Sequence, residues 1–274
     1  MKEKNINKNL IAKKCRMVAL LLFMALLLTP LTACSKKSEI EINILHAGGG
    51  ENSNVYLNAQ ETFEGYYSKG CRYFEYDLKL SSDGRIIGSH AGEHLPNVNF
   101  QTITYAEFKE LKLDNQMTPV NEEWLMETII SHPDVKIIVD AKMPTQVEDA
   151  KVLQRIEYLE SVYNYDVSAN IIPEVFSLEM WEILKETTSF NSYIFSHYKV
   201  YYSVDYVMEN FNDSRIIAIA MSVNCDSYYR KNLVKFKQEG WKIFMWDIHS
   251  SEDINRAQKL GANGVYVDFI NFDN

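Results

Sequence analysis

Two acidic residues and a histidine lie close together in the stretch 72–90 and are suited to form a site. Glu75 and Asp77 interrupt an aromatic and β-branched run whose composition is typical of a strand packed on both faces. Because residues i and i+2 of a strand point to the same face, both carboxylates converge on one spot. A buried strand face holds two ionised carboxylates only where partners offset the cost. The pair therefore indicates a site rather than a purely structural strand.

A turn and a short returning strand bring the histidine to the same region. Ser81-Ser-Asp-Gly84 is a turn signal whose glycine accepts positive φ. The apolar pair Ile86-Ile87 follows and leads to His90. Imidazole titrates near neutrality and can pass a proton in either direction. One strand and one hairpin thus combine two acids with an acid–base group.

From residue 41 onward, segments of strand length alternate with segments of helical pattern. The predicted strands cover residues 41–46, 71–79, 135–141, 170–176, 193–198, 215–222, 241–247 and 263–268. The predicted helices cover residues 58–69, 104–111, 119–131, 145–163, 177–187, 203–210, 227–239 and 251–260. This alternation predicts an α/β fold, a (β/α)₈ TIM barrel forming a single domain over residues 41–274. An open doubly wound sheet is the alternative.

The polar residues fall where such a barrel collects its chemistry, at the C-terminal ends of its strands. In strand order they are His46, Glu75 and Asp77, Asp140 and Lys142, Glu174, and Trp246 with Asp247. Their distribution supports the barrel and predicts one site at its C-terminal face.

The N-terminal 33 residues have the layout of a bacterial lipoprotein signal peptide. Six basic residues against one acid precede an apolar run of fifteen residues, Met17–Leu31, which is shorter than the ~20 residues of a membrane-spanning helix. Leu31-Thr-Ala-Cys34 resembles a lipobox, which implies cleavage before Cys34 and lipidation of its thiol. We therefore expect residues 34–40 to be a lipidated cysteine with a short tether, and the protein to be exported and lipid-anchored at the extracytoplasmic face of the cell membrane. A plain signal peptide or an uncleaved anchor is the alternative.

The mature chain is acidic and poor in cysteine. Removing six of 28 basic residues and one of 37 acids leaves 22 basic and 36 acidic residues, a net charge of −14. Nucleic acid is excluded as a partner because its phosphates require a basic footprint. An anionic substrate would then need a metal or particular Lys and Arg residues. Cys71 and Cys225 are too few for a disulfide framework, although a single bridge between them stays open.

Several motifs together resemble those of the glycerophosphodiester phosphodiesterase family. The Glu75-Tyr-Asp77 strand with Asp83-Gly and His90 is similar to the family's Glu-x-Asp and Asp-Gly…His block. Further similar segments are Ile44-Leu-His-Ala-Gly-Gly49, Asn58-Ala-Gln-Glu-Thr-Phe63, Ile137-Ile-Val-Asp-Ala-Lys142, Phe244-Met-Trp246 and Gly261-Ala-Asn-Gly-Val265. The resemblance covers residues 41–270 and is nearest to the bacterial branch of the phosphatidylinositol-specific phospholipase C-like superfamily.

The resemblance implies a metal-dependent hydrolase of phosphoric diesters. Glu75, Asp77 and Asp140 are three hard oxygen donors, which suit Ca²⁺ or Mg²⁺ rather than a thiolate-bound metal. The alternative for these acids is salt bridging with Lys142 or Arg72. The substrate would be a small glycerophosphodiester or a lipid head group, cleaved to glycerol phosphate and an alcohol by a protein that we expect to be a monomer.

The same resemblance implies roles for the remaining site residues. His46 and His90 are the acid–base pair, and Lys142 contacts the phosphate, or else only pairs with Asp140. Trp246 forms a wall against the glycerol or head group, Asn58 orients His46 or a ligand or caps its helix, and Glu174 binds the alcohol group. We interpret the remaining histidines as structural residues of the core or of turns: His94, His132, His197 and His249.

Two positions depart from the family pattern. Ala47 stands where the family commonly has an arginine that clamps phosphate, and Ala91 stands where an aspartate commonly follows the second histidine. Two alternatives to a glycerophosphodiesterase therefore stay open. One is a phospholipase C or D acting on intact phospholipid, and the other is a catalytically impaired lipoprotein that binds a phosphorylated ligand.

Overall fold

The structure is a computed structural model that describes residues 40–90, 92–114 and 116–270. The predicted signal peptide, the lipidated Cys34, most of the tether and Ala91 lie outside these residues. In the described part of the chain, no helix is both long enough and apolar enough to cross a membrane.

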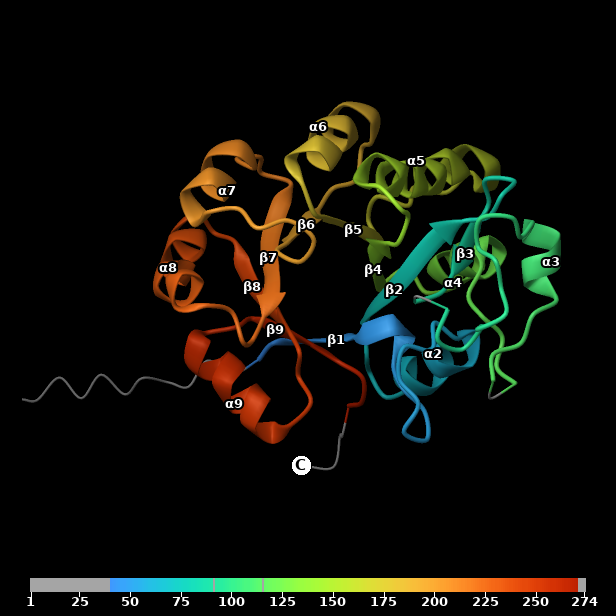
Figure 1. Ribbon diagram of the computed structural model, residues 1–274, viewed down its shortest axis with the longest axis horizontal. Coiled ribbons are helices and arrows are strands. Elements are labelled where there is room, and N and C mark those ends of the chain that lie inside the picture. Colours follow the sequence, from blue (N-terminus) through green and yellow to red (C-terminus); the bar gives the residue numbers. More distant parts are fainter. Residues whose placement is uncertain (1–39, 91, 115, 271–274) are drawn as a thin grey trace, which may run out of the picture. The chain divides into compact units, whose positions relative to one another are not determined.

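Eight parallel strands close into a barrel. They are β1 (Ile42–Leu45), β2 (Tyr73–Leu80), β4 (Lys136–Ala141), β5 (Ile171–Val175), β6 (Tyr193–Ser196), β7 (Ile216–Ser222), β8 (Lys242–Trp246) and β9 (Gly264–Val267). Strand β1 pairs with β9 and also with β2, so the sheet has no gap between its first and last strands (Figure 1). The predicted (β/α)₈ barrel is confirmed, and the open-sheet alternative is wrong.

The helices surround the strands and match the predicted segments (Figure 1). They are α2 (Gln60–Tyr67), α3 (Tyr105–Lys109), α4 (Glu122–Ser131), α5 (Gln146–Tyr163), α6 (Leu178–Thr187), α7 (Val204–Asn210), α8 (Ser227–Gln238) and α9 (Ser251–Leu260). Helices α5 to α9 each begin after a Thr, Ser or Asp whose side chain accepts a hydrogen bond from the helix's first turn. These caps satisfy N–H groups that have no partner within the helix and so fix where each helix begins.

The inside of the barrel changes from apolar to polar along the strands. Ile44, Ile138, Ile172, Ile194, Ala218 and Phe244 belong to one apolar cluster within the barrel. Two residues further along their strands, Asp140, Glu174, Ser196 and Trp246 line a cavity instead. Because side chains alternate between the two faces of a strand, each of these pairs shares the inner face. The polar site therefore lies directly next to an apolar layer inside the barrel.

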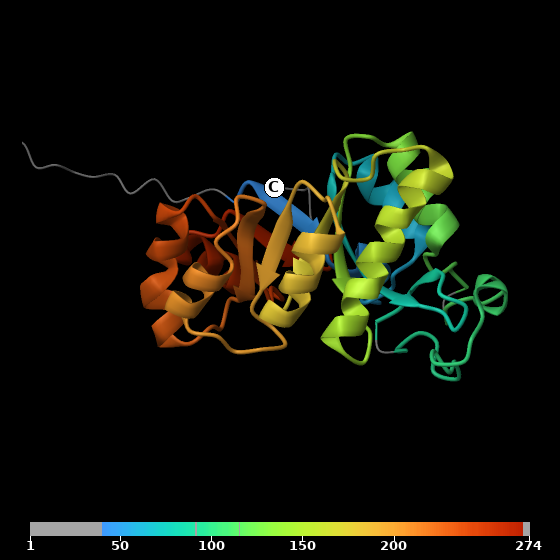
Figure 2. The same cartoon turned by 90° about the horizontal axis from the view of Figure 1, so that it is seen from above.

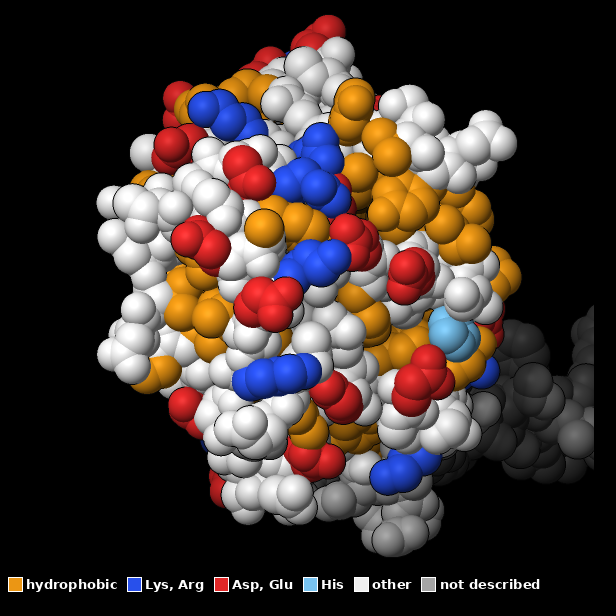
Figure 3. All heavy atoms as spheres, turned by 90° about the vertical axis from the view of Figure 1, so that its right-hand side faces the viewer, with side chains coloured by type: hydrophobic (Ala, Val, Ile, Leu, Met, Phe, Trp, Pro, Cys, Tyr) orange, Lys and Arg blue, Asp and Glu red, His pale blue; other side chains and the backbone are white. Residues whose placement is uncertain are grey.

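The antiparallel strand β3 (Ile86–Gly88) returns along β2, with Gly88 opposite Leu78. Residues 92–114 and 116–121 lie to one side of the barrel (Figure 2), around a small apolar cluster to which Leu57, Ala59 and Ile87 also belong. On the face that carries α3, acidic and basic side chains are interspersed rather than segregated (Figure 3). The antiparallel pairing of β3 with β2 confirms the predicted hairpin before His90.

A buried carboxylate fixes this hairpin to the barrel. Glu122 at the start of α4 is 1% exposed and pairs with Arg85 and, at 2.7 Å, with Arg155 of α5. It also accepts the Ile86 backbone N–H at 3.1 Å. Burial opposes ionisation of Glu122, but Arg155, the Ile86 N–H and Arg85 outweigh burial and hold its pKa below the usual 4.5.

We expect Glu122→Gln to destabilise the fold by about 2 kcal/mol at pH 7, because it removes one partner of a buried ion pair whose arginines are partly solvated. A depressed pKa contributes stability above the unfolded value, and this contribution is lost as the pH falls through the folded value. The difference in melting temperature between wild type and variant, followed by circular dichroism, should therefore shrink as the pH falls below the usual value of 4.5. A constant difference from pH 7 to pH 3 would contradict this.

Candidate active site

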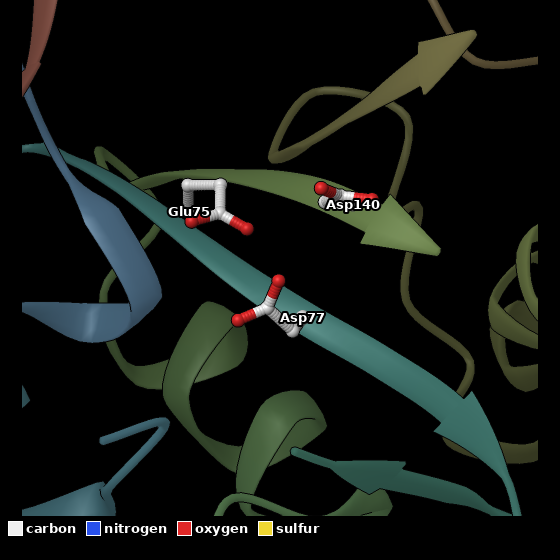
Figure 4. Close-up of side chains that lie close together, drawn as sticks. All are labelled: Glu75, Asp77 and Asp140. Carbon is white, nitrogen blue, oxygen red and sulfur yellow. The ribbon is translucent and has the colours of Figure 1, made fainter. Parts of the chain in front are cut away.

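Three carboxylates from two neighbouring strands converge at the C-terminal end of the barrel. Glu75 and Asp77 lie on β2 and Asp140 lies on β4, with Asp77 directly opposite Asp140 in the strand register. Figure 4 shows the three side chains pointing toward one another, and each offers an oxygen within 4.8 Å of the others. Glu75 and Asp77 are 2% and 0% exposed, so their charges face one another with little water between them.

This cluster has acceptor capacity that the protein leaves unused. Glu75 Oε1 and Asp140 Oδ1 are buried and have no hydrogen-bond donor among the described residues, and Asp77 Oδ1 faces only the Lys142 ammonium, at 3.1 Å. Buried polar atoms without partners are rare in folded proteins. The donor set therefore fits a hard divalent cation, in agreement with the predicted ligands.

The charges of the cluster are strongly coupled to Lys142. Burial, followed by the Asp77 charge, raises the pKa of Glu75 well above its usual value. The pKa of Asp77 is lowered despite burial, because Lys142 and then the two histidines favour its ionised form. Burial opposes the Lys142 ammonium, but Asp140 and Asp77 outweigh it and raise its pKa far above 10.5. Lys142 therefore stays charged beside two of the three acids.

The salt-bridge alternative is only partly realised. Lys142 does pair with Asp140 and Asp77. Arg72 instead pairs with Asp134 at 2.5 Å, and its guanidinium lies over the Tyr67 ring. Asp134 and Tyr67 both lie outside the acid cluster, so the predicted salt bridge between Arg72 and the three acids is wrong.

His46 lies directly after β1, at the start of the short 3₁₀ turn His46–Gly48. Its Nδ1 lies 2.9 Å from Asp268 Oδ1 and its Nε2 lies 3.9 Å from Glu75 Oε2. Because the carboxylate only accepts, Nδ1 is the donor, and Nε2 faces the acids. Burial disfavours the imidazolium, but the Asp268 hydrogen bond and the Glu75 charge outweigh it and raise the pKa of His46 to about 9.

The backbone after His46 turns sharply toward the acids. Ala47 and Gly48 have φ of +46° and +77°, and the Ala47 N–H donates to Glu75 Oε2 at 2.7 Å. A Cβ at Gly48 would lie 2.5 Å from the Tyr76 ring, so only glycine fits there. The small residues at these positions thus allow the chain to pass close to β2 and to hold Glu75 with a backbone donor.

His90 lies on the cavity wall beside an aromatic residue from another loop. Its ring stacks on Tyr56 at 4.6 Å between centroids, and its Nδ1 lies 3.2 Å from Glu93 Oε2. Tyr56 also meets the His46 ring edge-on at 4.9 Å. Tyr56 has φ of +58°, which is unusual for a residue of its size and indicates that the surrounding loop constrains it. One tyrosine therefore contacts both histidines.

Asn58 takes neither the helix-capping role nor the role of orienting His46. Its side chain donates to Asp77 Oδ2 at 2.8 Å and accepts the Asp77 backbone N–H at 2.9 Å. Ala59 occupies the N-cap position of α2, and its side chain makes no capping hydrogen bond. Asn58 thus neither caps the helix nor contacts His46; it orients one of the acids.

A cavity of about 170 Å³ opens above the cluster. Among the predicted residues its lining includes His46, Glu75, His90, Asp140, Lys142, Glu174 and Trp246. At its inner end, Glu174 is 4% exposed and bonds to the hydroxyls of Tyr266 and Ser196. Burial and the nearby Asp140 raise the pKa of Glu174 to about 7. The structure therefore brings together nearly all predicted site residues, while Asp77 and Asn58 lie beneath the cavity lining.

Several lining residues had not been predicted, among them Tyr56, Ser196, Tyr198, Ile248, Tyr266 and Asp268. Tyr266 and Asp268 lie at the end of the last predicted strand. The expectation that polar residues at the C-terminal ends of strands form the site (the strand-end rule) was therefore sufficient to find them. Tyr56 and Tyr198 lie in loops that carry no periodic signal.

The remaining histidines and cysteines largely follow the prediction. His94 bonds to the Val55 carbonyl, His132 to the Thr128 carbonyl, and His197 packs on Tyr229, whereas the exposed His249 lines the cavity. Cys71 and Cys225 are both free, so no disulfide joins them.

Comparison with known proteins decides the family. Residues 47–272 match the model of the glycerophosphoryl diester phosphodiesterase family. The chain belongs to this family. It is accordingly a phosphodiesterase, a hydrolase of phosphoric diesters. No curated protein matches the sequence.

Solved structures of the family share the fold. A glycerophosphodiester phosphodiesterase from Thermotoga maritima is 21% identical with a TM-score of 0.64, over 83% of this chain and 94% of that one. A glycerophosphoryl diester phosphodiesterase from Parabacteroides distasonis is 17% identical with a TM-score of 0.62, over 84% of each chain. A phosphodiesterase from Oleispira antarctica, solved with the product sn-glycerol-3-phosphate, is 14% identical with a TM-score of 0.62, over 84% of this chain and 93% of that one.

The acid cluster predicts opposite effects of one substitution with and without metal. In metal-free protein near pH 7 we expect Glu75→Gln to raise the melting temperature, because burial and the Asp77 charge raise the pKa of Glu75, and a carboxyl with a raised pKa costs stability at this pH that glutamine does not cost. With Ca²⁺ or Mg²⁺ at about 100 times its dissociation constant, wild type should gain roughly 5–10 °C, whereas Glu75→Gln and Asp140→Asn should gain much less.

Differential scanning calorimetry with and without the ion measures both effects. Asp134→Asn is the control, since Asp134 is 52% exposed and lies outside the cluster. An equal gain for all four proteins would exclude the cluster as the binding site.

Proposed function

We propose that this phosphodiesterase hydrolyses glycerophosphodiesters to glycerol phosphate and an alcohol. The proposal rests chiefly on one observation: the carboxylate cluster, Lys142, His46 and His90 lie around a single cavity. The product bound by the Oleispira antarctica relative supports the same substrate class.

The phosphate would be held by positive charge at the inner end of the cavity. Glu75, Asp77 and Asp140 would bind Ca²⁺ or Mg²⁺, which polarises phosphoryl oxygens when bound. Lys142 is the only Lys or Arg in the cavity lining among the described residues. Because Ala47 is buried and offers no charge, Lys142 takes over the contact that an arginine makes in other family members.

The two histidines are suited to move protons on either side of the phosphate. One removes a proton from the nucleophile, which is water or the neighbouring glycerol hydroxyl, and the other protonates the leaving alkoxide. Asp268 accepts the Nδ1–H of His46 and so orients the ring with Nε2 toward the acids. Tyr56 and Glu93 keep the His90 ring against the cavity wall.

We expect His46→Ala and His90→Ala each to lower kcat by roughly 10²–10⁴-fold, the usual effect of losing a general acid or base. His132→Ala is a matched control, because His132 has a similarly low exposure but contacts Thr128 and the α2 side of the barrel. Hydrolysis of glycerophosphocholine with excess Mg²⁺ or Ca²⁺, and then with chelator, measures both the histidine and the metal requirement. Unchanged activity in His90→Ala would refute its proton-transfer role, and a metal-dependent affinity for glycerol phosphate without turnover would favour a binding protein.

We also propose that the enzyme is held at the extracytoplasmic membrane surface through a lipidated Cys34. The basic and apolar segments before Leu31-Thr-Ala-Cys34 support this. Mass spectrometry of the protein from membranes should find the mature chain beginning at acylated Cys34, and Cys34→Ala should abolish acylation. An unmodified Cys34 in membrane-bound protein would disprove the anchor.

A further inference from the structure

The inner part of the cavity offers positive charge to a ligand, whereas the outer part offers aromatic rings. Lys142 and the proposed cation provide positive charge inside, where a phosphate binds. Further out, Trp246 at the end of β8 and Tyr198 after β6 form an aromatic corner, with ring centroids 5.8 Å apart and ring planes at 88°. The two rings meet edge to face, and the ring faces that this contact leaves open present the π-surface that attracts a cation.

A carboxylate without a cationic partner stands beside this corner. Asp247 follows Trp246, lines the cavity, and forms no ion pair with any Lys, Arg or His among the described residues. Its Oδ2 accepts the Ser222 hydroxyl at 2.6 Å, and its φ is +62°. The backbone there is one that L-residues seldom adopt, so the surrounding structure holds this carboxylate in place.

The corner lies within reach of the phosphate site. The Lys142 ammonium is 5.4 Å from the centroid of the Tyr198 ring, and that ring in turn contacts Trp246. A substituent joined to the phosphate through two carbons therefore reaches the corner when the phosphate contacts Lys142. Choline and ethanolamine have this spacing between phosphate and nitrogen.

We propose that Tyr198, Trp246 and Asp247 form a subsite for a cationic head group, and that the preferred substrates are zwitterionic diesters carrying a quaternary ammonium. The aromatic faces bind the methylated cation, and Asp247 supplies the opposite charge. This subsite rests on the proposed function and adds the substrate class. Head groups that carry no cation, such as glycerol or inositol, gain nothing from it.

The test uses a substrate that differs from glycerophosphocholine only in charge. In the 3,3-dimethylbutyl ester a carbon replaces the ammonium nitrogen, so size and shape are kept. We expect kcat/KM to favour the choline ester by about tenfold, and we expect the difference to lie mainly in KM, because the head group does not react.

Three variants separate the charge from the aromatic wall. Asp247→Asn removes only the charge, since asparagine tolerates positive φ and still accepts the Ser222 hydroxyl; it should reduce the preference severalfold. Tyr198→Leu should do the same. Tyr158→Leu is the control, because Tyr158 on α5 is also 57% exposed but lies outside the cavity lining.

A binding measurement distinguishes failure of the subsite from failure of the proposed function. Phosphocholine and 3,3-dimethylbutyl phosphate are titrated into the metal-loaded protein by calorimetry. Equal kcat/KM for the two esters would overturn the subsite and leave the hydrolase intact. Tighter binding of phosphocholine without hydrolysis of either ester would uphold the subsite and refute the proposed function, and no preference in either measurement would overturn the subsite.

Discussion

The structure depends on the confinement of three carboxylates with little solvent at one end of the barrel. Like charges at such short range are unfavourable unless each is compensated, and the surrounding chain supplies that compensation. Lys142 pairs with Asp77 and Asp140, Asn58 holds Asp77, and the Ala47 N–H holds Glu75. Oxygens that remain without donors define where a divalent cation fits. Local features such as the glycine turn after His46 follow from the need to bring donors close to these acids.

The barrel can hold these carboxylates at one end because side chains alternate between the two faces of its strands. The inner face of β4 presents Ile138 and then Asp140, and that of β5 presents Ile172 and then Glu174. A two-residue step therefore separates an apolar layer, which stabilises the fold by burial, from a polar layer that binds. The loops beyond the polar layer carry aromatic side chains, and these set the shape and polarity of the cavity mouth.

Sequence reasoning succeeded where short-range rules apply. Strand composition and the spacing of Glu75 and Asp77 act over a few residues, so the elements, the barrel and this acidic pair were predictable. Asp140 was added to the pair by its position at a strand end and by the family resemblance. Asn58 was misinterpreted because its partner, Asp77, is 19 residues away and no local pattern records that contact. Tyr56 was missed for a similar reason: a loop with positive φ carries it to the histidines. Asp268 was within reach of the strand-end rule, since it directly follows β9.

The site residues are divided between two parts of the barrel. The acids of the metal-ligand cluster, both histidines and Lys142 come from β1 to β4 and the segments just after these strands, whereas the aromatic corner comes from the ends of β6 and β8. The residues proposed for the chemistry and those proposed for head-group recognition therefore lie in separate stretches of the chain. Substitutions after β6 and β8 can change what the protein accepts while the hydrolytic residues stay in place. Such a layout lets closely similar barrels diversify in substrate, and it gives the protein engineer two loops to redesign.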